Sequence, residues 1–128
     1  MSALNLDPQP LCASATLQAG GDAHLFDVLD LADAGRTAPA FVVRHGEQVV
    51  AFLNRCAHIP TEMDWQPGKF WDLERQYLIC AVHGAMYEPD TGRCVSGPCP
   101  GAKLQSLRVA EADGQVHWYP DARFQPVF

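Results

Sequence analysis

The chain is organised around two short motifs, Cys56-Ala57-His58 and Cys80-Ala81-Val82-His83, which are separated by residues 59–79. Each motif supplies one sulfur ligand and one nitrogen ligand. Mixed ligand sets of this kind suit iron–sulfur clusters or zinc. The single residue inside the first motif favours a loop, because in a strand the two ligand side chains would crowd each other on one face. The sequence therefore predicts a metal centre shared between two loops.

The order of the ligands separates the candidate centres. A zinc finger groups like ligands, with a pair of cysteines followed by a pair of histidines. Here each motif mixes the two types, and the cysteine comes first both times. This pattern resembles the Rieske [2Fe–2S] pattern, in which two histidines replace two cysteines on one of the irons. The resemblance implies that Cys56 and Cys80 bind one iron, and that His58 and His83 bind the other.

The residues after the second motif also bear on the centre. Gly84 permits a tight turn where a bulkier residue would block the approach of the backbone to a ligand. High-potential Rieske relatives carry a serine two residues after the last histidine and a tyrosine four residues after it. These positions hold Ala85 and Tyr87 here. We therefore expect the Tyr87 hydroxyl near the Cys56 sulfur and a midpoint potential between the extremes of the family.

A proline-rich stretch follows at 96–101, Ser-Gly-Pro-Cys-Pro-Gly. It resembles the proline loop that covers the cluster in Rieske proteins, where Pro98 and Pro100 would stiffen the chain and keep that side dry. Rieske proteins of membrane complexes also carry a disulfide between their ligand loops. The corresponding positions hold Thr61 and Val82, so that bridge cannot form. The resemblance is therefore to the soluble Rieske ferredoxins.

Composition excludes several other classes. The 128 residues fit one domain, and a hydrophobic content of 48% is too high for a disordered chain. The net charge of −6 argues against nucleic acid as a partner. No apolar run approaches the roughly 18–20 residues that span a bilayer, and residues 1–8 do not read as a secretory signal. We therefore expect a cytoplasmic protein with no membrane partner.

Residues outside the motifs suggest no second site. Because disulfides are uncommon in a reducing cytosol, Cys12, Cys94 and Cys99 are expected to be thiols, with a Cys94–Cys99 disulfide as the alternative. Glu62 and Asp64 have no partner at a meaningful spacing for acid–base chemistry.

Strand patterns dominate the rest of the chain. A hairpin is predicted from 40–44 and 48–53, and a second from 104–110 and 115–119. Further strands are expected at 14–19, 24–31 and 77–79, with a loop at 32–39 and an irregular end at 120–128. The long connection 59–76 is expected to pack down with a short strand at 70–72, the alternative being a partner-contact surface beside the cluster. The fold class is all-β. By resemblance it is a Rieske-like fold, a single domain over 1–128 with a cluster-binding subdomain at about 54–101.

These features predict a soluble one-electron carrier for an oxygenase or related redox system, without a catalytic site of its own. Its cofactor would be a [2Fe–2S] cluster, and its partners a reductase, an oxygenase or both. A Rieske oxygenase would need a further iron site of two histidines and a carboxylate, for which the chain has neither the length nor the spare histidines. The alternatives are a small Rieske-type subunit of a larger reductase and a zinc-stabilised binding module.

Overall fold

The computed structural model describes residues 4–56, 62–64, 66–81, 84–97 and 102–127. Its strands are β1 (Gln9–Ala13), β2 (His24–Asp30), β3 (Arg36–His45), β4 (Gln48–Leu53), β5 (Leu78–Ile79), β6 (Met86–Tyr87), β7 (Cys94–Ser96), β8 (Ser106–Leu107), β9 (Val109–Ala112), β10 (Gln115–Trp118) and β11 (Phe124–Pro126). Two single-turn 3-10 helices lie at η1 (Ser14–Thr16) and η2 (Leu31–Asp33). None of the described residues form a helix long and apolar enough to cross a membrane.

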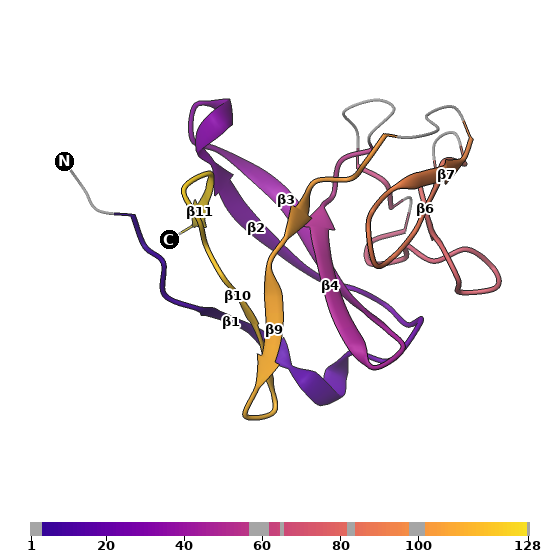
Figure 1. The fold of residues 1–128 in the computed structure, drawn as a ribbon, viewed down its shortest axis with the longest axis horizontal. Coiled ribbons are helices and arrows are strands. Elements are labelled where there is room, and N and C mark those ends of the chain that lie inside the picture. Colours follow the sequence, from indigo (N-terminus) through magenta and orange to yellow (C-terminus); the bar gives the residue numbers. More distant parts are fainter. Residues whose placement is uncertain (1–3, 57–61, 65, 82–83, 98–101, 128) are drawn as a thin grey trace.

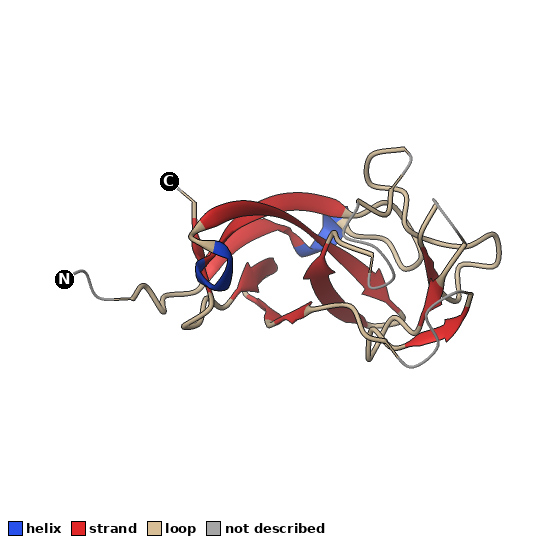
Figure 2. Ribbon diagram, turned by 90° about the horizontal axis from the view of Figure 1, so that it is seen from above, coloured by secondary structure: helices blue, strands red, loops and turns tan. Residues whose placement is uncertain are grey.

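The strands form three antiparallel sheets (Figure 1). One sheet has five strands in the order β11-β2-β3-β4-β8, and the others have the orders β1-β10-β9 and β5-β6-β7. Figure 2 shows the third sheet and its loops at one end of the molecule, beyond the strands of the other two. The prediction of an all-β fold is confirmed. The third sheet falls within the range 54–101, whose status as a subdomain remains a prediction.

The hairpin of β3 and β4 is buried on both of its faces. Because successive strand residues face opposite sides, Ala40 and Val42 belong to one buried cluster, whereas Phe41 and Val43 belong to another. The residues of β4 alternate in the same way. A strand covered on both faces has a nearly continuous apolar sequence, as at 40–43. The hairpin is therefore the common wall of two hydrophobic cores.

We call these the base core and the centre core. The base core draws its side chains from the five-stranded sheet, from β10 and from Leu17 after η1. It contains Leu17, Val28, Ala38, Ala40, Val42, Ala51, Leu53, Leu107, Val116, Trp118 and Phe124. The centre core contains Phe41, Val43, Phe52, Cys56, Met63, Phe70, Leu78, Cys80, Ala85, Tyr87, Cys94 and Leu104. Both motif cysteines are thus in the second core.

Both predicted hairpins are present. The first turns at Gly46-Glu47, where Gly46 has a φ of +61°. The second turns at Asp113-Gly114, where both residues have positive φ, as the tight turns of hairpins require. Its first strand is interrupted, because β8 pairs with β4 while β9 pairs with β10. The strand predicted at 24–31 is also confirmed as β2.

Three predictions about prolines and ends are wrong. The first strand is β1 and not 14–19, because Pro10 is accommodated on an edge strand beside a bulge. The predicted loop 32–39 ends earlier, since β3 begins at Arg36 and includes Pro39. The carbonyl of Pro39 accepts from Asn54 N, so its missing N–H faces the side where β4 has ended. The end of the chain is not irregular throughout, because β11 pairs with β2.

An ion pair holds β3 to the sheet that contains β9. Arg44 donates from both terminal nitrogens to the carboxylate of Glu111, at 2.9 Å each, and its Nε donates to Leu17 O at 2.8 Å. The hydrogen bonds from Arg44 lower the pKa of Glu111. The guanidinium therefore joins the two sheets of the base core by hydrogen bonds as well as by charge.

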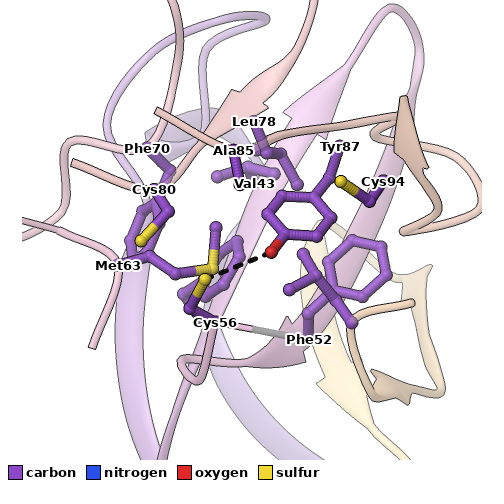
Figure 3. Close-up of a cluster of buried hydrophobic side chains, with 12 residues drawn as sticks. Val43, Phe52, Cys56, Met63, Phe70, Leu78, Cys80, Ala85, Tyr87 and Cys94 are labelled. Carbon is purple, nitrogen blue, oxygen red and sulfur yellow. Dashed lines mark hydrogen bonds between the residues drawn. The ribbon is translucent and has the colours of Figure 1, made fainter. Parts of the chain in front are cut away.

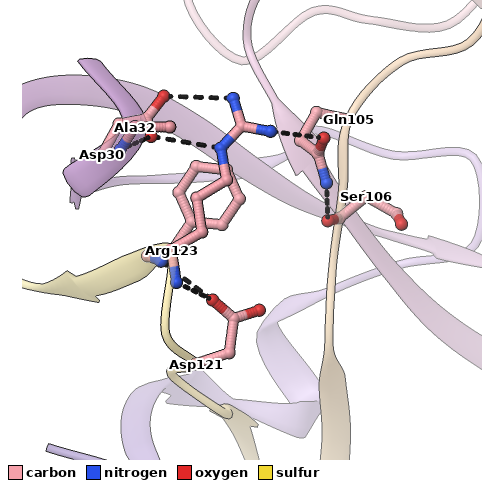
Figure 4. A network of polar contacts seen from close by, with 7 residues as sticks. Asp30, Ala32, Gln105, Ser106, Asp121 and Arg123 are labelled. Carbon is pink, nitrogen blue, oxygen red and sulfur yellow. Dashed lines mark hydrogen bonds and ion pairs between the residues drawn. The ribbon is translucent and has the colours of Figure 1, made fainter. Parts of the chain in front are cut away.

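A second ion pair holds β11 against β2 (Figure 4). Arg123 donates from Nε to Asp30 Oδ1 at 3.1 Å and from Nη2 to Oδ2 at 3.3 Å, and Ala32 N donates to Oδ1 at 3.0 Å. The Asp30 side chain is buried, whereas that of Arg123 is partly exposed. The hydrogen bond from Arg123 lowers the pKa of Asp30 and outweighs the opposing effect of burial.

The Asp30→Asn change is expected to lower the free energy of unfolding by about 1–3 kcal/mol at neutral pH, because charge-assisted hydrogen bonds are lost. Since the pKa of Asp30 is lower in the folded state, its carboxylate stabilises the fold above the unfolded pKa of about 3.9. This contribution is lost as the pH falls through the folded pKa. Urea denaturation at neutral pH and at about pH 3 should show the gap between wild type and variant closing.

The exposed Asp33 of the same turn supplies the control, and Asp33→Asn should change little at either pH. Equal stability of the wild type and Asp30→Asn at neutral pH would show that the ion pair does not hold β11.

Candidate metal centre

The two motif cysteines approach from different sheets. Cys56 lies shortly after β4 of the five-stranded sheet, and Cys80 follows β5 of the small sheet directly. Cys56 is 3% exposed and Cys80 is fully buried. Both lie in the centre core, and Figure 3 shows their side chains on the same side of Tyr87, with Met63 between them. Two thiols from separate loops are therefore brought into one dry environment.

Tyr87 reaches the first of these thiols (Figure 3). Its Oη lies 3.2 Å from Cys56 Sγ, and its side chain is fully buried. The prediction that this hydroxyl lies near the Cys56 sulfur is confirmed. Either atom could be the donor. If Cys56 is an iron-bound thiolate, the hydroxyl must donate, because a thiolate has no proton.

The second motif is part of a tight turn. Cys80 N donates to Ala85 O at 2.8 Å, and Gly84 N donates to Cys80 O at 2.9 Å. Gly84 has a φ of +73°, a backbone conformation that residues other than glycine rarely adopt. A Cβ atom added to Gly84 would meet none of the described residues within 4 Å. The hydrogen bonds of the turn therefore fix the backbone of Cys80.

Gly97, at the start of the proline-rich stretch, lies close to the turn that follows the second motif. It has a φ of +99°, and a Cβ atom there would lie 2.8 Å from Ala85 Cα. Only glycine fits at this distance, so the backbone at Gly97 packs directly against that of Ala85. Cys94 Sγ donates to Ser96 O at 3.4 Å on the same strand.

The long connection packs against the core, as predicted. Phe70 and Met63 are fully buried, and the Phe70 ring stacks on Phe41 with centroids 3.8 Å apart. The expected strand at 70–72 is absent, because Trp71 forms only a single bridge with Leu78.

Several predicted residues lie outside the described ranges. These are the ligands His58 and His83, the loop residues Pro98 and Pro100, and the positions Thr61, Val82 and Cys99. The ligand set and the proline loop therefore remain predictions, and so does the pairing of Cys94.

Sequence reasoning missed Asn54 and found no partner for Asp64. The structure joins them, since Asn54 Nδ2 donates to Asp64 Oδ1 at 2.7 Å. The sequence shows only an asparagine two residues before Cys56. Its partner lies ten positions further along, across a loop.

The described residues fit an iron–sulfur cluster. Two buried cysteines supply sulfur ligands, which as thiolates are the usual ligands of such clusters. A buried hydroxyl lies at hydrogen-bond distance from one sulfur, and apolar side chains surround both. Hydrogen bonds to sulfur and a dry environment are the features that set the potential of a bound cluster.

The sequence matches the family model of the Rieske [2Fe-2S] domain over residues 7–120. The solved ferredoxin of carbazole 1,9a-dioxygenase from Nocardioides aromaticivorans IC177 is 20% identical, with a TM-score of 0.66, over 89% of this chain and 98% of that chain. A chain in the complex of reduced oxygenase and oxidized ferredoxin in carbazole 1,9a-dioxygenase is 25% identical, with a TM-score of 0.66, over 90% of this chain and 94% of that one.

Larger proteins share the same fold. The terminal oxygenase of carbazole 1,9a-dioxygenase from Nocardioides aromaticivorans IC177 is 18% identical, with a TM-score of 0.68, over 97% of this chain but 33% of the oxygenase chain. None of the curated protein sequences is significantly similar to this chain.

The antiparallel sheets and the paired buried thiols are those of an all-β iron–sulfur domain. The chain belongs to the Rieske [2Fe-2S] domain family, whose model covers residues 7–120. Its cofactor is accordingly a [2Fe–2S] cluster.

Proposed function

We propose that this protein carries single electrons to a terminal oxygenase, with Cys56 and Cys80 on one iron of its cluster and His58 and His83 on the other. The observation that carries the proposal is the nearly complete mutual coverage with a ferredoxin, 89% of this chain and 98% of that one. The solved complex of an oxygenase with a ferredoxin supports an oxygenase as the acceptor. A reductase is the donor we propose, because the cluster must be reduced before it can pass an electron on.

The bound cluster supplies a site that gains and loses one electron. The chain's own residues would set its properties: the centre core excludes water, and the Tyr87 hydroxyl donates to the Cys56 sulfur. Two neutral imidazoles in place of two thiolates leave the site less negative, which raises the potential above that of all-cysteine clusters. Pro98 and Pro100 would cover the centre, and a cytoplasmic location remains a prediction.

Metal analysis and spectroscopy of aerobically purified protein test the assignment. We expect two irons and two sulfides per chain, on the stoichiometry of the cluster, with a Rieske-type EPR spectrum after reduction. Zinc without sulfide would instead support the zinc-stabilised module. Reoxidation of the reduced protein by a terminal oxygenase tests the carrier role, whereas tight copurification with a reductase would support the alternative of a reductase subunit.

The Tyr87→Phe change is expected to lower the midpoint potential. A hydrogen bond to sulfur favours the more negative reduced state, so its loss favours the oxidised state. A differential strength of about 1 kcal/mol corresponds to about 40 mV for a one-electron couple. Protein-film voltammetry measures the shift, with Tyr119→Phe beyond β10 as the control. An unchanged potential in Tyr87→Phe would mean that the hydroxyl gives no hydrogen bond to the bound cluster.

A further inference from the structure

Asn54 is a buried polar side chain at the base of the first ligand loop. It is 5% exposed and follows the last residue of β4. Its Oδ1 accepts from Met63 N at 2.8 Å, and its Nδ2 donates to Asp64 Oδ1 at 2.7 Å. The partners fix the orientation of the amide, because an N–H requires its oxygen and a carboxylate requires its nitrogen. One side chain thus joins the two ends of the loop that carries Cys56.

The hydrogen bonds continue on both sides of this contact. Met63 O accepts from Ala81 N at 2.9 Å, and Ala81 is the residue after the second cysteine ligand. Asp64 Oδ2 accepts from Gly68 N at 3.0 Å, and Gly68 O accepts from Ala23 N at 2.9 Å. The base of the first loop is therefore linked to the second loop and to the chain that enters β2.

We infer that Asn54 and Asp64 form a clamp that positions the first ligand loop relative to the second. The inference rests on the proposed function, because it concerns the spacing of Cys56 and Cys80 around a cluster. Closing the loop at its base removes conformations in which the first sulfur lies away from the second. Both clamp residues are positioning residues, since they act on the ligands through the backbone of residues 63 and 81.

The Asn54→Asp change tests the clamp with almost no change in shape. It replaces the donor at 2.7 Å by an oxygen, so two carboxylates would face each other. In the cluster-loaded protein we expect the amides of Met63 and Gly68 to exchange with solvent at least about tenfold faster. We also expect faster loss of iron to a chelator and broader EPR lines, because the ligands no longer hold one geometry.

The double change Asn54→Asp/Asp64→Asn is the decisive variant. It reverses the pair, and every hydrogen bond can form again: a carboxylate oxygen at position 54 accepts from Met63 N, and the amide at position 64 donates to that carboxylate. The amide oxygen at position 64 accepts from Gly68 N. Slow amide exchange, slow iron loss and narrow EPR lines should therefore return. Restoration by this pair is a result that simple removal of a buried polar group cannot give.

Gln125→Glu is the matched control. Gln125 is a similarly buried amide in β11, on the opposite side of the molecule from the third sheet (Figure 1), and it donates to Asp121 O at 2.7 Å. This change should lower global stability without altering exchange at 62–69 or the EPR lines. The clamp would be overturned if Asn54→Asp matched the wild type in amide exchange, iron loss and EPR line width. It would also be overturned if the double variant restored none of these properties. A wild-type protein without iron and sulfide would overturn the proposed function instead. Amide exchange at Met63 and Gly68, compared between that protein and its Asn54→Asp and double variants, would then still decide whether the clamp forms.

Discussion

The Cys80→Ala variant is expected to lack the [2Fe–2S] cluster entirely. Cys80 follows β5 directly, and its side chain is fully buried, so bulk solvent does not supply a ligand that replaces the sulfur. Its backbone N–H bond to Ala85 O does not depend on the side chain, and the turn should keep its course. Iron, sulfide and the visible absorption of the cluster should fall to background in the purified variant.

Two other cysteines provide the controls for this prediction. Cys94 belongs to the same core, but Figure 3 places it on the other side of Tyr87 from Cys80. Cys12 lies in β1, among the strands of the base. Cys94→Ala and Cys12→Ala should both retain iron and sulfide. A Cys80→Ala protein with the iron content of the wild type would disprove the ligand assignment, and so would loss of the cluster from a folded Cys94→Ala protein.

The Phe70→Ala variant is expected to lose about 3–5 kcal/mol of unfolding free energy, because a fully buried ring leaves a cavity. Its ring stacks on the Phe41 ring, with centroids 3.8 Å apart. The Phe41 ring also packs against the tilted ring of Phe52, with centroids 6.0 Å apart. This loss is a large part of the roughly 5–15 kcal/mol that stabilises an ordinary domain. Chemical denaturation of the cluster-loaded protein measures it, and the temperature at which the cluster bleaches should fall in parallel.

Leu73 lies in the same connection and is fully exposed, so Leu73→Ala is the natural control and should change stability by less than about 0.5 kcal/mol. If Phe70→Ala lost as little unfolding free energy as Leu73→Ala, the connection 59–76 would not be part of the centre core. Phe70→Leu separates the two contributions, since it keeps much of the buried volume and loses the ring stack.

Local patterns in the sequence were sufficient for most of the framework. Alternating and continuous apolar runs predict β2 and the hairpin of β3 and β4, and Asp113-Gly114 predicts the second turn. The position of Tyr87 beside Cys56 followed from the resemblance to the family, and the 3.2 Å contact agrees with it.

Features that depend on distant partners could not be predicted in this way. β11 pairs with β2, next to the contact of Arg123 with Asp30, 93 positions earlier. The three residues of β11 show no strand pattern of their own. Pro39 predicts a break in the strand. In the structure it lies within β3, because its carbonyl accepts a hydrogen bond from Asn54 N just after the end of β4. The pairing of Asn54 with Asp64 likewise depends on the closed loop, and neither residue type indicates it alone.

The double burial of the β3–β4 hairpin limits how this protein can vary. A single inserted residue in either strand would exchange its two faces, placing the small Ala40 where the Phe41 ring stacks and the ring among the residues of the base core. One mutation would then disrupt the packing of both the base core and the centre core. Insertions and deletions among natural relatives should therefore accumulate in exposed segments such as 73–76 and be excluded from 40–43 and 49–53.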